Sequence, residues 1–199
     1  MNKVGISVGH FGPGTGASFQ LTDEWTVANT NASDIVLRLH KEGKLTPVFI
    51  TINRDQHPWD LIQQVSKLSP PSFLGALGNV DVRYEWAIRE KIGALVELHY
   101  NSAAFGKPEG HEVWVRTLPG PKTKHLGELL IKEFDDQLEN PARGLKQKAY
   151  RTLVKLHSAN VPAVILEPAF IWEECIVQRE WQEKYRNAVI TALYSFFNV

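Results

Sequence analysis

The stretch ALVELHYN, residues 94–101, decides the fold. Its first five residues are apolar except for one glutamate and predict a buried strand, which His99 follows directly. Residues 5–12 (GISVGHFG) and 161–168 (VPAVILEP) have the same pattern: the first apolar run ends in a histidine, His10, and the second ends in a glutamate, Glu167. Strand carboxyl ends of an open α/β sheet converge on one crevice. The sequence therefore predicts that two histidines and a glutamate meet there.

Strand-like and helix-like patterns alternate along the chain. Helical spacing of apolar residues predicts a helix from Trp25 to Leu39, which Gly43 ends. The other predicted elements are strands over 4–8, 48–52, 94–98, 112–116 and 163–166 and helices over 83–92, 126–138, 148–157 and 181–196, with a short helix near Pro58 and a loop over 69–78. This order predicts one α/β domain over 1–199, with a mostly parallel or mixed central sheet flanked by helices on both faces.

Composition excludes several classes of function. Hydrophobic residues make up 43% of the 199 residues, which is enough for a packed core. Lys plus Arg and Asp plus Glu both number 22, so no basic excess favours nucleic acid or an anionic membrane as partner. No apolar run reaches membrane-spanning length. Cys175 is the single cysteine, which rules out an intramolecular disulfide and a cysteine-based zinc site.

The first residues enter a strand-like run directly, without the apolar core and cleavage pattern of a signal peptide. We therefore expect a protein made in the cytoplasm without a signal peptide.

His10 and His99 have the residue type and placement of metal ligands. Neutral imidazoles suit zinc, and catalytic zinc commonly binds two histidines and one carboxylate, which leaves a position for water. Glu24 opens the predicted helix and is a plausible third ligand. Asp23 and Glu97 compete for that role, although Glu97 alternates with Leu98 and could point to the other face of the sheet. The residues alone leave this choice open.

Glu167 ends an otherwise apolar strand. Burial raises the pKa of a carboxyl group and a neighbouring metal lowers it, so Glu167 could exchange a proton with water and a leaving nitrogen. The alternative is a structural glutamate paired with a lysine or arginine. His111 follows the His99 loop and opens a strand, which makes it a candidate for supporting a metal ligand or for contacting substrate.

Five motifs in register resemble the zinc-dependent N-acetylmuramoyl-L-alanine amidases of bacterial and phage cell-wall lysis. They are GHFG (residues 9–12), a glutamate that opens a helix (Glu24), ELHYNSA (97–103), RGLK (143–146) and PAVILEPAF (162–170). The likeness covers nearly the whole chain in the same order, so it is fairly specific.

The resemblance implies His10, Glu24 and His99 as ligands of one Zn²⁺ per chain and Glu167 as the catalytic carboxylate. It also implies that Asn101 lies beside the site, in contact with substrate. The implied reaction is hydrolysis of the amide between N-acetylmuramic acid and L-alanine in peptidoglycan. We expect a monomer that acts on the cell wall, as a phage endolysin would after waiting in the cytoplasm for lysis.

The chain also departs from the family pattern. Phe11 replaces a glycine, Glu97 stands where a small residue is usual, Pro168-Ala169 replaces a small polar residue and a glycine, and 55–81 matches little. None of these changes removes a proposed ligand or the acid. They leave two alternatives open: a zinc carboxypeptidase or amidohydrolase acting on a small peptide or acyl-amino acid, and a non-catalytic wall-binding module.

Overall fold

The computed structural model of the protein describes residues 2–10, 14–20, 22–50, 80–104 and 106–199. The strands are β1 (Lys3–Val8), β2 (Ser18–Phe19), β3 (Thr22–Asp23), β4 (Thr46–Ile50), β5 (Ala94–Leu98), β6 (His111–Val115), β7 (Ala142–Gln147) and β8 (Ala163–Glu167). The helices are α1 (Glu24–Glu42), α3 (Val80–Arg89), α4 (Pro121–Gln137), α5 (Arg151–Ser158), α6 (Arg179–Phe197) and the short 3₁₀ helix η2 (Glu174–Val177).

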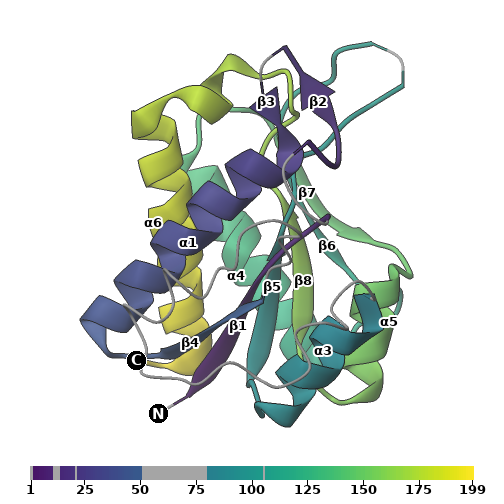
Figure 1. Cartoon of the computed structure of the whole chain (residues 1–199), viewed down its shortest axis with the longest axis vertical. Coiled ribbons are helices and arrows are strands. Elements are labelled where there is room, and N and C mark those ends of the chain that lie inside the picture. The colour runs from purple at the N-terminus through teal and green to yellow at the C-terminus, as the bar shows by residue number, and fades with distance from the viewer. Residues whose placement is uncertain (1, 11–13, 21, 51–79, 105) are drawn as a thin grey trace.

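A six-stranded mixed sheet runs through the molecule in the order β4-β1-β5-β8-β6-β7. Strands β4, β1, β5 and β8 are parallel neighbours, whereas β6 is antiparallel to β8 and parallel to β7. Because of this reversal, β6 begins where β8 ends, and Glu112 pairs with Glu167. The predicted fold class, a mixed sheet with helices on both faces, is confirmed (Figure 1).

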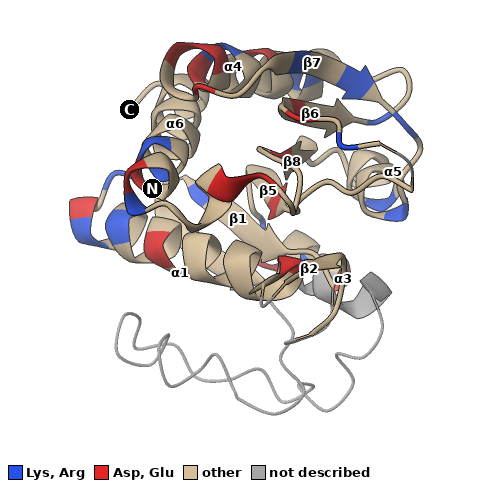
Figure 2. Ribbon diagram, turned by 90° about the horizontal axis from the view of Figure 1, so that it is seen from above, with Lys and Arg blue, Asp and Glu red and all other residues tan. Residues whose placement is uncertain are grey.

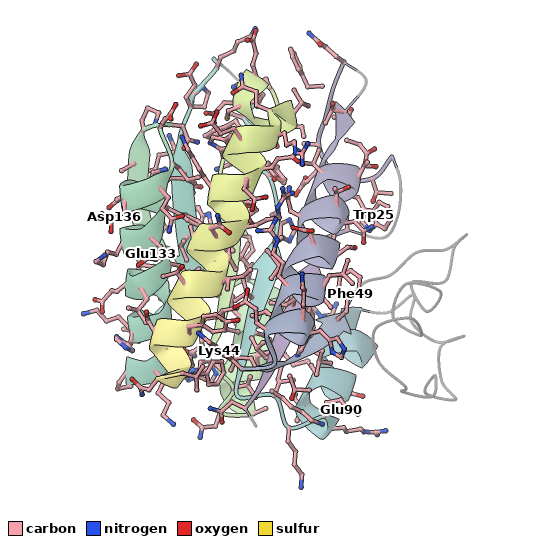
Figure 3. The ribbon with its side chains drawn as sticks, turned by 90° about the vertical axis from the view of Figure 1, so that its left-hand side faces the viewer. Trp25, Lys44, Phe49, Glu90, Glu133 and Asp136 are labelled. Atoms are coloured by element: carbon pink, nitrogen blue, oxygen red, sulfur yellow. The ribbon has the colours of Figure 1, made fainter. Side chains whose placement is uncertain are left out.

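The sheet separates two apolar cores. Helices α1, α4 and α6 cover one face, and α3 and α5 cover the other (Figures 1 and 2). Helix α6 lies between α1 and α4 (Figure 3), and Phe134 and Tyr185 meet there in the larger core. Odd-numbered residues of β5 and β8, such as Leu95 and Ile165, face the smaller core. The period of two along each strand puts Glu97 and Glu167 on that same face.

Helix α1 has the ends that its sequence predicts. Asp23 precedes it, and its carboxylate accepts a hydrogen bond from the backbone N–H of Thr26 at 2.9 Å. Gly43 follows it with φ 68°, a left-handed conformation that glycine adopts at low cost, and its N–H bonds the carbonyl of Leu39. These ends fix Glu24 as the first helical residue, facing the sheet.

The main difference from prediction is strand β7. The sequence predicts no strand between the helices over 126–138 and 148–157, but residues 142–147 form an edge strand and α5 starts at Arg151. An edge strand pairs on one side only, and this one carries arginine, lysine and glutamine, so it lacks the apolar alternation that marks a strand.

Other predicted elements agree to within a few residues, and α4 begins earlier, at Pro121. The predicted helix near Pro58 and the loop over 69–78 lie outside the described residues. Within the described part of the chain, every helix is too short or too polar to cross a lipid bilayer.

Candidate metal centre and neighbouring carboxylates

His10, Glu24 and His99 converge beyond the carboxyl ends of β1 and β5. Oε2 of Glu24 lies 2.9 Å from Nε2 of His10, and Oε1 lies 2.8 Å from Nδ1 of His99. One nitrogen or oxygen atom from each side chain lies within 4.8 Å of the others, so the group could hold a metal ion. Two imidazoles and one carboxylate are a donor set that zinc commonly takes.

Two glycines leave room for this cluster. A Cβ at Gly9 would lie 2.0 Å from Cε1 of His99, so the imidazole occupies the space that any other residue would fill. A Cβ at Gly16 would lie 2.6 Å from Oε2 of Glu24, and Gly16 also has φ 84°. His10 itself has φ 64°, a conformation that non-glycine residues seldom adopt and that is found at functional sites.

Replacing Gly9 by alanine is expected to abolish tight metal binding. The new methyl group must displace the His99 ring from Glu24, and such overpacking typically costs about 1–3 kcal/mol of stability. Elemental analysis and urea unfolding of the purified variant measure both effects. The matched control is Gly120→Ala, because the nearest atom to that Cβ position is 3.9 Å away. Full metal occupancy in the Gly9 variant would contradict the packing argument.

The three competing carboxylates occupy different places. Asp23 caps α1, whereas Glu24 is buried and also accepts bonds from the N–H groups of Ala17 and Tyr100. Burial alone would raise the pKa of Glu24, but its hydrogen bonds with His10 and His99 outweigh burial and hold the pKa far below the usual value. Glu24 is therefore a carboxylate at neutral pH.

Glu97 points to the face of the sheet that α3 and α5 cover, opposite to α1, as its alternation with Leu98 predicts, and from there it reaches the His99 ring. Its Oε1 is 3.1 Å from Nε2 of His99. Burial opposes charge on His99, yet the hydrogen bonds with Glu24 and Glu97 raise its pKa to about 10. In the metal-free protein the ring is thus a cation between two carboxylates, and a metal ion binding there must displace a proton.

Glu167 ends β8 beside the cluster. The N–H of His99 donates to the carbonyl of Leu166 at 3.0 Å, which brings these strand ends together. Oε2 of Glu167 is buried and has no hydrogen-bond partner among the described residues. Burial raises the pKa of Glu167 to about 8. The positive charge of His99 lowers this pKa, whereas the negative charges of the neighbouring glutamates raise it further. The carboxyl group is thus poised to gain or lose a proton near neutral pH.

A second polar cluster, which sequence reasoning missed, surrounds the buried carboxylate of Glu112. It accepts bonds from Asn101 (2.6 Å), Trp114 (3.0 Å) and Arg143 (2.7 Å), and Lys146 lies 3.1 Å away. These bonds, above all those from Arg143 and Lys146, lower the pKa of Glu112 although burial opposes them.

A β-bulge brings Arg143 to Glu112. His111 pairs with Ala142 and Glu112 pairs with Gly144, so Arg143 is the extra residue of β7. Bulges often redirect a side chain next to a functional site. Figure 2 shows Lys and Arg colouring along this edge of the sheet. Gly144, which pairs with Glu112 at the shift, has φ 80°, and a glycine inside a strand often marks a bulge.

His111 lies elsewhere. Its ring is buried against Phe134, with Nε2 2.8 Å from Asp135 and Nδ1 3.2 Å from Asn140. These contacts lie on the α4 side of the sheet, opposite to the face of Glu112 and Glu167. They favour a structural role, and a contact of His111 with substrate stays an untested prediction.

A cluster of metal-ligating type at the strand ends of an α/β sheet, with a buried carboxylate beside it, is typical of metal-dependent hydrolases. The family model that matches this chain gives the specific class. It describes N-acetylmuramoyl-L-alanine amidase and matches residues 4–195. The chain therefore belongs to the N-acetylmuramoyl-L-alanine amidase family. No curated protein matches the sequence significantly.

Solved structures share the fold. An N-acetylmuramoyl-L-alanine amidase from Clostridium difficile 630 superposes with a TM-score of 0.80 at 18% identity, covering 99% of this chain and 97% of that one. The amidase AmiC2 of Nostoc punctiforme superposes with a TM-score of 0.77 at 17% identity, covering 100% of this chain and 98% of that one. The catalytic domain of the endolysin CD27L, which targets C. difficile, superposes with a TM-score of 0.65 at 17% identity, covering 98% of this chain and 98% of that one.

Proposed function

We propose that this chain is a zinc-dependent hydrolase that cleaves the amide between N-acetylmuramic acid and L-alanine in peptidoglycan. The observation that carries this proposal is the convergence of His10, Glu24 and His99 in a member of the amidase family. Glu167, on the neighbouring strand, supplies the titratable carboxyl group that amide hydrolysis requires.

The three residues fit a divalent zinc ion. Their two nitrogen atoms and one carboxylate group match a common catalytic zinc donor set, and Gly9 and Gly16 keep the space around them clear. His10 would use Nε2 and His99 would use Nδ1, because these atoms face Glu24. When bound, zinc would act as a Lewis acid on the scissile carbonyl and would make nearby water more acidic.

Glu167 would move the proton. As a carboxylate it accepts a proton from the attacking water, and as a carboxylic acid it donates that proton to the departing amine of L-alanine. Its Oε2 has no hydrogen-bond partner among the residues that the structure describes, which supports this role, because a structural glutamate would be expected to have a fixed cationic partner. A cation in the neighbouring cluster would lower the raised pKa of Glu167 and favour the basic form.

Asn101 is the proposed substrate contact. It follows β5 two residues after His99, and its amide nitrogen donates to Glu112. That bond fixes the side chain close to Glu167, because Glu112 and Glu167 are cross-strand partners. The guanidinium of Arg143 lies in the same cluster, 2.7 Å from the Glu112 carboxylate.

The deciding experiment combines metal analysis with product analysis on purified peptidoglycan. The proposal predicts about one zinc per chain and the release of L-alanine amino groups while the glycan strands stay intact. Release of a carboxyl-terminal amino acid would instead indicate a carboxypeptidase. Sedimentation with the wall without any product would indicate a binding module. Chelator-treated protein with zinc restored controls for irreversible damage.

The raised pKa of Glu167 predicts a pH-dependent stability difference in metal-free protein. The folded state keeps a proton on Glu167 up to about pH 8, whereas an ordinary glutamate releases it near pH 4.5. The resulting stabilisation is complete below pH 4.5 and is lost as the pH rises through 8. The uncharged Glu167→Gln variant should therefore gain stability relative to the natural protein over this range. Urea unfolding with a chelator present measures the difference, and parallel profiles would contradict it.

The proposed substrate sets the place of action at the cell wall. Service as an endolysin after phage lysis stays a prediction, and expression inside a host cell with and without a membrane-permeabilising protein tests it. A monomeric enzyme stays a prediction from the sequence. Light scattering of the zinc-loaded protein measures the oligomeric state.

A further inference from the structure

Glu97 lies directly beside a proposed metal ligand. It is buried on β5, with an exposed fraction of 3%, and its Oε1 lies 3.1 Å from Nε2 of His99. The other ring nitrogen of His99, Nδ1, lies 2.8 Å from Oε1 of Glu24. The imidazole therefore spans two carboxylates, of which Glu24 belongs to the proposed metal cluster and Glu97 does not.

Three other elements hold the Glu97 carboxylate in place. Ser7 of β1 donates its hydroxyl to Oε2 at 3.3 Å, and the Tyr84 hydroxyl of α3 donates to the same oxygen. Thr152 of α5 lies 3.3 Å from Oε1 and 2.9 Å from the Tyr84 oxygen. The side chains of Ser7, Tyr84 and Thr152 are all buried. The orientation of Glu97 is thus fixed by one neighbouring strand, β1, and by the two helices that cover the smaller core, α3 and α5.

The chemistry of the two groups determines where the ring proton lies. An ionised carboxylate only accepts hydrogen bonds, so Nε2 of His99 must carry a hydrogen atom in order to bond Glu97. A neutral imidazole with its hydrogen on Nε2 has its lone pair on Nδ1. That lone pair points toward Glu24 and the cluster. Carboxylate partners of metal-bound histidines commonly fix both tautomer and ring orientation in this way.

We infer that Glu97 is a positioning residue, which holds the His99 ring so that Nδ1 is presented to the metal ion. The inference rests on the proposed metal centre and adds a residue that does not itself bind the metal. The alternative role, Glu97 as a ligand in place of Glu24, is an outcome of the test below.

The first measurement is zinc affinity, by competition with a chromophoric chelator. Loss of a carboxylate behind a histidine ligand typically weakens metal affinity about 10–100-fold. We expect a loss in this range for Glu97→Ala and a smaller loss for Glu97→Gln, whose amide oxygen can still accept from Nε2. Glu112→Gln is the matched control, because Glu112 is a buried carboxylate on the same sheet face. It accepts its hydrogen bonds from Asn101, Trp114 and Arg143. Glu112→Gln should therefore lower zinc affinity less than Glu97→Gln does.

The second measurement is the tautomer of His99, by NMR of zinc-loaded protein labelled with ¹⁵N-histidine. We expect a protonated Nε2 in the natural protein and a changed Nε2 signal in Glu97→Ala, whereas a purely structural role would leave this signal unmoved. Tyr84→Phe, which keeps Glu97 but removes one of its donors, serves if Glu97→Ala does not fold, and should move the same signal less.

Three outcomes would overturn the inference. The first is an unchanged zinc affinity and an unchanged His99 tautomer in Glu97→Ala. The second is a hydrogen on Nδ1 of His99 in the natural zinc-loaded protein. The third is the loss of one zinc ligand from the X-ray absorption spectrum of Glu97→Ala, which would make Glu97 a ligand. A natural protein that binds no zinc would instead contradict the proposed function, so the two failures are distinguishable.

Discussion

Glu167→Ala is expected to lower the turnover of peptidoglycan by about 10²–10⁴-fold, the usual contribution of a general acid–base residue, while zinc content stays unchanged. The physical reason is the separation of roles between neighbouring side chains. His10, Glu24 and His99 form the proposed metal cluster, whereas Glu167 lies on the adjacent strand with a buried Oε2 that has no hydrogen-bond partner in the described part of the chain. Removing it deletes the proton carrier and leaves the donor set complete.

Amine release per enzyme molecule and elemental analysis on the same preparation make this test quantitative. Glu133→Gln is a suitable control, because Glu133 lies on α4 and its carboxylate accepts a hydrogen bond from Gln137 of the same helix. Near-normal turnover of Glu167→Ala would remove Glu167 from the mechanism. Loss of zinc together with turnover would show that Glu167 belongs to the metal site.

His99→Ala is expected to empty the metal centre and to abolish turnover with it. The variant lacks one of the three donors, so the loss of affinity should exceed the roughly 100-fold upper range for residues that only support a ligand. It also leaves Glu24 without the 2.8 Å partner that offsets its burial. Chelator competition and elemental analysis measure the occupancy.

His125→Ala controls for the loss of a histidine as such, because His125 is exposed on α4 and packs against Phe196. This control should keep its zinc. Full zinc occupancy in His99→Ala would contradict the proposed ligand assignment, whatever the activity of the variant.

The features of the site that could be predicted from sequence are those with a local cause. The strand over residues 94–98 has the predicted bounds, since five consecutive buried positions have a clear pattern. Gly43 ends α1 because a left-handed residue is needed there. Glu24 follows a capping aspartate, so it enters the first helical turn. The convergence of His10 and His99 follows from parallel strands that end at one edge.

Contacts between distant segments could not be predicted in this way. The sequence indicates that Glu97 could point away from Glu24, but not what it contacts there, because its partners Ser7, Tyr84 and Thr152 lie on three other elements. Strand β7 escaped detection because an edge strand needs no apolar alternation, and the bulge at Arg143 depends on its register with β6.

The amino-acid sequence by itself determined the α/β architecture, the family and which side chains end the central strands. These properties depend on local periodicity and on short motifs, both of which are present in the sequence alone. Only the tertiary structure decided which ring nitrogen of each histidine faces Glu24. It also decided that Glu97 contacts the other ring nitrogen of His99, and that Arg143 and Lys146 form ion pairs with Glu112. The physical reason is that hydrogen-bond geometry and burial arise from segments that meet only in the folded chain.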